Sequence, residues 1–233
     1  MERHLQTLKS AFITLLFLLY AFSAPAQAPS FEKKIRIPVW AELDAYPELA
    51  EAADTDSELY DYPIKSIRRV APFLISGMIY GWKFVYVPSD KARGVEEYLE
   101  VTEILDINDT AEKITYTSPW IQNNRLNCWC EFNRSEAQIQ NYRMWNSIQH
   151  PVIQGRGSGS LSRGFDGIRE AAEDALKNAV REHFRSRIKN KPKEIRGSVL
   201  IKDSPTVGIS SGRYVMNLDF FLEYGRILEY TQY

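Results

Sequence analysis

One stretch constrains the fold of this chain more than any other: residues 166–189, DGIREAAEDALKNAVREHFRSRIK. Its apolar residues recur every three or four positions, which is the period of an amphipathic α-helix. They are Ile168, Ala171, Ala172, Ala175, Leu176, Ala179, Val180, Phe184 and Ile188. Acidic residues gather early in the stretch and basic residues late, as the helix dipole favours. Because four alanines lie on the apolar stripe, we expect this helix to lie close to the surface that it covers.

The segments around this helix alternate between apolar and polar residues, most clearly over residues 213–227. Such alternation indicates antiparallel strands with one buried and one solvated face. A shorter helix is expected near residues 63–78, interrupted at Pro72, because an internal proline removes a helical hydrogen bond. We therefore predict an α+β fold, in which the helix at about 166–189 covers one face of a mostly antiparallel sheet. The apolar fraction of 44% and the charged fraction of 25% are those of an ordinary globular protein.

The first 28 residues have the pattern of a secretory signal peptide. Arg3 and Lys9 precede a short apolar core at 11–22, and Ala26-Gln27-Ala28 forms an A-x-A cleavage site. We expect cleavage near Ala28, export to the periplasm or the medium, and a single α+β domain over 29–233. A subdivision at the Gly/Ser-rich loop 155–164 is the alternative. Because no second long apolar run follows, we expect no transmembrane helix in the mature chain.

Four aromatic residues, Tyr80, Trp82, Phe84 and Tyr86, alternate along one predicted strand and therefore share a face. An exposed row of this kind would bind sugar rings or an apolar ligand by stacking. The alternative is that the row fills the core beneath a helix, since aromatic residues are common on buried strand faces. The two interpretations differ only in whether the face is exposed.

An acidic segment at 42–61 contains the spacing Asp54-x-Asp56-x-Glu58, whose alternate oxygens resemble the start of a calcium loop. Leu59 and Lys65, however, stand where an EF-hand needs glycine and a bidentate glutamate. The simpler interpretation is a solvated acidic loop. We therefore expect no cofactor, with a calcium ion at these three residues as the alternative.

The run 155–164, GRGSGSLSRG, stands between a short apolar segment and the long helix. Backbone amides with Ser158 and Ser160 would suit an anion there, although the glycine spacing does not match a dinucleotide motif and a flexible connection is the simpler interpretation. Farther on, residues 181–196 carry seven basic and two acidic residues. This run would contact anionic lipid or glycan, or complement the end of the helix.

The sequence offers few groups for catalysis. It lacks an H-E-x-x-H motif, and its two cysteines, Cys128 and Cys130, are too few for a zinc site. They are expected to be small apolar side chains on a buried strand face, or a redox-active pair if oxidised.

The favoured function is therefore an exported, non-catalytic envelope or extracellular protein that binds a partner protein, an envelope polymer or an apolar ligand. The near-neutral net charge of −1 argues against nucleic acid as a partner. One alternative is a carboxylate-based hydrolase of glycans, favoured if Asp90, Glu96, Glu97 or Asp219 lines a cleft beside Trp82. A second alternative is a small outer-membrane β-barrel.

Overall fold

The computed structural model describes residues 30–44, 60–106, 108–185, 187–188 and 190–230. Apart from Ser30, the elements discussed below belong to one unit, Phe31–Tyr233. The helices are α2 (Ser30–Lys33), α4 (Asp61–Ile79), α5 (Asn108–Ala111), α6 (Glu136–Trp145) and α7 (Phe165–Arg185), with short 3₁₀ turns at Lys91–Arg93 and Leu161–Arg163. The strands are β1 (Lys34–Glu42), β2 (Trp82–Val87), β3 (Tyr98–Glu103), β4 (Thr115–Gln122), β5 (Arg125–Asn133), β6 (Val152–Ser160), β7 (Glu194–Ile201), β8 (Thr206–Ser210) and β9 (Arg213–Leu228).

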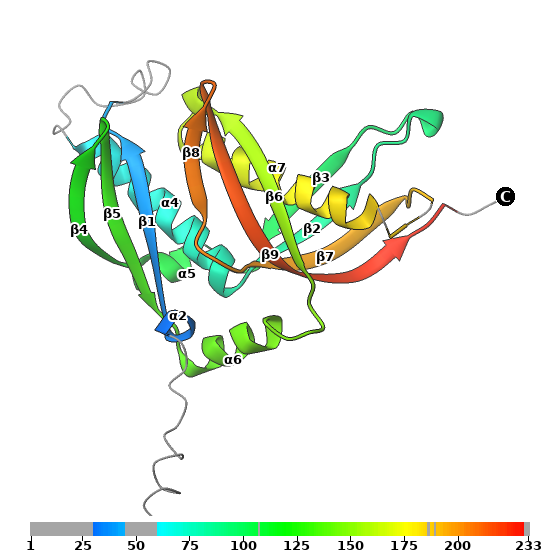
Figure 1. Ribbon diagram of the computed structural model, residues 1–233, viewed down its shortest axis with the longest axis horizontal. Coiled ribbons are helices and arrows are strands. Elements are labelled where there is room, and N and C mark those ends of the chain that lie inside the picture. Colours follow the sequence, from blue (N-terminus) through cyan, green and yellow to red (C-terminus); the bar gives the residue numbers. More distant parts are fainter. Residues whose placement is uncertain (1–29, 45–59, 107, 186, 189, 231–233) are drawn as a thin grey trace, which may run out of the picture. The chain divides into compact units, whose positions relative to one another are not determined.

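Every strand pair is antiparallel among the described residues, and the strands form two sheets (Figure 1). The smaller sheet has the order β1-β5-β4, and the larger has the order β3-β2-β7-β9-β6, with β8 also paired to β9. The predicted α+β class is confirmed. Within the described residues, no helix combines the length and apolarity that a membrane crossing requires.

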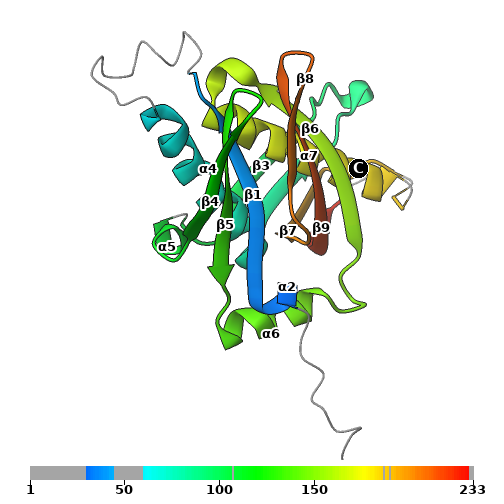
Figure 2. The ribbon, with the colours of Figure 1, turned by 60° about the vertical axis from the view of Figure 1, so that its left-hand side comes forward.

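Helix α4 lies between the two sheets and contacts β1 and β5 of the smaller sheet and β7 of the larger (Figure 2). The predicted interruption at Pro72 is wrong, because the helix is continuous from Asp61 to Ile79. Proline costs a helix one hydrogen bond and a steric clash, about 3 kcal/mol. Burial of bulky side chains around it, including Phe73, Leu74 and Met78, supplies more than enough apolar contact to keep the helix whole.

Helix α7 covers the larger sheet and packs mainly on β6 and β9. The predicted apolar stripe is buried from Ile168 to Phe184, although the helix ends at Arg185 and leaves Ile188 beyond it. The alanines of the stripe face three glycines of β6. A Cβ atom on Gly157 would lie 2.1 Å from the Ala175 nitrogen, and one on Gly155 would lie 1.9 Å from the Ala175 oxygen. Helix and strand are therefore in backbone contact, as the alanine content predicted.

Helix α6 covers the opposite face of the larger sheet. Its first turn is closed by a capping box, in which the Ser135 hydroxyl and the Gln138 side chain each accept from the other residue's backbone amide. Tyr142 and Trp145 are buried with Leu200 and Phe221 in a small second core. The larger sheet is thus covered on one face by α7 and over part of the other face by α6.

Candidate functional site

The predicted aromatic row is not an exposed platform. Trp82, Phe84 and Tyr86 are each at most 3% exposed, and Trp82 stacks on Phe73 of α4 with ring centroids 5.2 Å apart. Tyr80 is half-buried and its hydroxyl accepts a hydrogen bond from Gln138. Trp82, Phe84 and Tyr86 fill the core beneath the helices, because this face of β2 points inward. Tyr80 caps the end of α4 and is not part of the strand, so the prediction of four aromatic residues on one strand is wrong. Tyr86, at the end of the row, also borders a pocket.

The prediction of a loop over 155–164 is also wrong, because residues 152–160 form strand β6. The amides of Ser158 and Ser160 do face carboxylates, but these belong to the protein itself. Ser158 donates to Asp174 Oδ2 at 3.0 Å, and Ser160 donates to Glu170 Oε2 at 3.1 Å. The positions assigned to a bound anion are therefore taken by side chains of α7.

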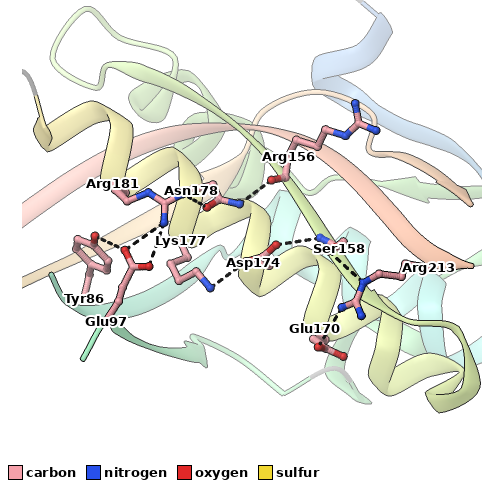
Figure 3. Close-up of polar contacts among 10 residues, drawn as sticks. All are labelled: Tyr86, Glu97, Arg156, Ser158, Glu170, Asp174, Lys177, Asn178, Arg181 and Arg213. Atoms are coloured by element: carbon pink, nitrogen blue, oxygen red, sulfur yellow. Dashed lines mark hydrogen bonds and ion pairs between the residues drawn. The ribbon is translucent and has the colours of Figure 1, made fainter. Parts of the chain in front are cut away.

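These two bonds belong to a ladder along the edge of β6 that pairs with no other described strand. Figure 3 draws the bond between Ser158 and Asp174 and the third bond of the ladder. The third bond is donated by Asn178 Nδ2 to the Arg156 carbonyl at 2.8 Å. Four helical residues advance about 6 Å and two strand residues about 6.7 Å, so side chains spaced by four on α7 match alternate residues of β6. We call Glu170, Asp174 and Asn178 the edge ladder. They give the edge strand the partners that a neighbouring strand would otherwise supply.

The remaining predicted sites divide into two groups. Asp54, Asp56 and Glu58 lie outside the described residues, so the calcium site stays a prediction. Cys128 and Cys130 are both buried on the inner face of β5, with 3.6 Å between their sulfur atoms. The hydrogen bond with Cys128 and burial raise the pKa of the Cys130 thiol. A buried thiol with a raised pKa reacts slowly, whereas the hydrogen bond with Cys130 lowers the pKa of Cys128.

A pocket of about 310 Å³ lies beside the C-terminal half of α7, and we call it the Tyr86 pocket. Its lining residues are Tyr86, Pro88, Ser89, Glu97, Arg181, Phe184, Arg185, Ile188, Lys191, Pro192 and Ile195. They come from β2, from the segments before β3 and β7, from β7 itself and from α7. Pockets that bind small molecules in proteins are about 300–1,000 Å³, so this one has room for a small ligand.

The polar wall of the Tyr86 pocket is centred on Glu97 (Figure 3). The Tyr86 hydroxyl donates to Glu97 Oε1 at 2.7 Å, and Arg181 Nη1 lies 3.0 Å from Oε2 of the same carboxylate. Burial and the adjacent Glu97 carboxylate raise the pKa of Tyr86. The tyrosine therefore keeps its proton near neutral pH and is a hydrogen-bond donor rather than a nucleophile.

The floor of the pocket is apolar. Phe184 is 5% exposed and Ile195 is fully buried, and Ile188 closes one side. Arg185 and Lys191 stand at the exposed rim. An apolar floor with a few charged groups at one end is the usual composition of a site for an amphipathic small molecule.

A second cleft, of about 360 Å³, lies along the exposed side of α7 and shares Glu97 with the first. We call it the carboxylate cleft, after Glu97, Glu170, Glu173 and Asp174; Tyr98, Leu99, Ser158, Lys177 and Arg213 complete it. Burial raises the pKa of the Glu173 carboxyl, Arg169 lowers it, and the nearby Glu170 and Glu103 raise it further. Among the described residues, His, Cys, Asp and Glu do not form a group of three or more that would hold a metal ion.

The Tyr86 pocket was not identified from the sequence, although two of its parts carried signals. Tyr86 ended the aromatic row, and Arg181, Arg185 and Lys191 belonged to the basic run 181–196. What joins them is the pairing of β2 with β7, which brings Tyr86 opposite Ile195. Glu97, proposed as a cleft residue of a hydrolase, does line both hollows, but Trp82 lies in the core and not beside it.

Comparison with known proteins gives a family but no activity. An uncharacterized protein of Treponema pallidum (strain Nichols) is 28% identical over 203 residues, which cover 85% of this chain and 83% of that protein. No solved structure matches the chain. A family model without a functional description matches residues 22–230. The chain therefore belongs to this uncharacterised family.

Proposed function

We propose that the protein is exported after cleavage near Ala28 and that it binds a small apolar ligand in the Tyr86 pocket without transforming it. The observation that carries the proposal is the pocket itself, with its buried apolar floor of Phe184 and Ile195. Burial of apolar ligand surface there would drive binding.

The polar wall supports binding rather than catalysis. Tyr86 and Arg181 both direct their hydrogen bonds to Glu97, so the three groups hold one another in place. A protonated tyrosine and an ion-paired carboxylate orient a ligand but offer it no activated nucleophile. Such a fixed wall suits a site whose task is to hold a molecule in one orientation.

Export is tested by determining the N-terminus of the protein isolated from cells. We expect Pro29 as the first residue. Recovery of the chain with Met1 or Glu2 at its N-terminus would contradict the proposed processing.

Binding is tested by the thermal stability of the purified protein with a panel of apolar and amphipathic small molecules. A ligand at a hundredfold excess over its dissociation constant stabilises the folded state by about 2.7 kcal/mol. The variant Ile188→Trp, which fills the pocket from its side, should lose this stabilisation while its own melting temperature changes little. Ile121→Trp, on the exposed face of β4, is the matched control and should keep it. Stabilisation that survives Ile188→Trp would place the ligand elsewhere.

A second candidate function is a glycan hydrolase acting in the carboxylate cleft. The observation in its favour is the raised pKa of Glu173 beside other carboxylates, the relation that a general acid requires. The test is hydrolysis of an envelope glycan. Loss of hydrolysis in Glu173→Gln, with hydrolysis retained in the exposed control Glu182→Gln, would support the hydrolase. A glycan that binds without being cleaved would oppose it.

A further inference from the structure

We infer that the ligand of the Tyr86 pocket is a small amphiphile with one anionic head group, an inference that rests on the binding function proposed above. It follows from the charges around the pocket, from the partners of those charges, and from the volume. The charges and their partners indicate where the head group would lie, and the volume indicates the size of the apolar part.

The charged residues of the pocket wall are unequal in number. Arg181, Arg185 and Lys191 are basic, whereas Glu97 is the single acid among the lining residues. The Arg181–Glu97 ion pair, at 3.0 Å, neutralises one charge of each sign. The two cations that remain, Arg185 and Lys191, give the rim an excess of positive charge that would attract an anion.

The partners of these two cations leave their charge available. Lys191 Nζ donates to the Ser89 carbonyl at 2.6 Å, and a carbonyl carries no net charge. Arg185 lies 3.4 Å from Glu182, but the side chains of this pair are 75% and 59% exposed. Exposed pairs of this kind contribute little, about 0–1 kcal/mol. A carboxylate or sulfate at the rim would therefore gain two charged donors without breaking a strong interaction.

The ion pair on the inner wall fixes the orientation of the ligand. Because Arg181 is already paired with Glu97, the inner wall offers an anion no unpaired cation, so the head group belongs at the rim near Lys191 and the apolar part over Phe184 and Ile195. The volume of about 310 Å³ is at the lower end of known ligand pockets. It favours one short chain or one ring system over a lipid with two acyl chains.

The experiment compares octanoate, octanol and octylamine, which share a chain and differ in head-group charge, by titration calorimetry at low salt. Octanoate should bind about tenfold more tightly than octanol, a difference of about 1.4 kcal/mol, and octylamine should bind most weakly. The double variant Arg185→Gln/Lys191→Gln should bind octanoate and octanol equally. The control Arg187→Gln/Lys193→Gln removes the same charge outside the pocket lining and should keep the preference.

The outcomes separate this inference from the proposed function. Equal binding of octanol and octanoate to the unaltered protein would overturn the anionic head group and leave an apolar-ligand protein. A preference that survives Arg185→Gln/Lys191→Gln would likewise overturn it, because the anion would then lie elsewhere. Binding of none of the three, together with binding to vesicles of anionic lipid, would assign the cations to a membrane surface and overturn both.

Discussion

The two long helices of this protein are buried in opposite ways. Helix α4 is buried on all sides over residues 70–79, where its bulky side chains include Phe73, Leu74 and Met78, and it contacts both sheets. Helix α7 instead presents alanines to a strand of alternating glycines, and its backbone touches the strand directly. Bulky side chains hold α4 in place, whereas small residues allow the backbones of α7 and β6 to touch. Truncation should therefore damage α4 most, whereas added atoms should damage the contact of α7 with β6.

The largest loss of unfolding free energy is expected when a bulky buried side chain of α4 is truncated. Phe73→Ala removes a buried ring that stacks on Trp82 and meets Phe165 edge to face. Truncations of this kind cost about 3–5 kcal/mol because they leave a cavity. Urea unfolding should show the loss as a lower midpoint. Met144→Ala, on the exposed side of α6, should leave the midpoint nearly unchanged.

The next effect is expected where β6 gains a single methyl group. A Cβ on Gly157 would lie 2.1 Å from the Ala175 nitrogen and 2.2 Å from the Ala171 oxygen, so the helix must move away. We expect Gly157→Ala to lower the unfolding free energy by about 3 kcal/mol, the upper end for overpacking. At Gly208 a Cβ would have no described heavy atom within 4 Å, so Gly208→Ala is the control. Equal midpoints for the two variants would contradict the direct backbone contact.

A smaller effect is expected from the edge ladder. Asp174→Ala leaves the Ser158 amide without its carboxylate acceptor at the strand edge, where water can replace it. A hydrogen bond to a charged group contributes about 1.5–3 kcal/mol, and solvent access at this edge should bring the cost to the lower end. Hydrogen exchange should become faster at Ser158. Asp174→Asn, which keeps an acceptor oxygen, should restore much of the protection.

The smallest expected effect is a change in how folding stability depends on pH, caused by Glu173 on the exposed side of α7. A carboxyl whose pKa is raised in the folded state binds its proton more tightly there than in the unfolded chain. For Glu173 the folded state should therefore gain stability as the pH falls toward the ordinary value of 4.5, and lose it as the pH rises through the raised pKa. Glu173→Gln should flatten this part of the stability profile. The exposed control Glu136→Gln should leave the profile unchanged.

The sequence predicted the parts of the fold that depend on local pattern. Two such patterns were confirmed: the helical period of α7, and the alternation of Tyr214, Met216 and Leu218 in β9. Both depend only on residues that are close together in the sequence. Strand β6 was missed because glycine favours loops, and its glycines make sense only once α7 is known to lie against them. The Tyr86 pocket was missed for a related reason: strand pairing brings its walls together from distant parts of the chain.

The edge ladder also sets a limit on how this chain can change length. Its three bonds join every fourth residue of α7 to every second residue of β6, so they fix the register of the helix along the strand. One residue inserted between Glu170 and Asn178 would turn the rest of the helix by about 100° and carry the far side chains off the strand edge. Insertions and deletions among relatives should therefore fall in the turn at 161–164 or beyond Arg185. The parts of β6 and α7 that the ladder joins should keep their lengths.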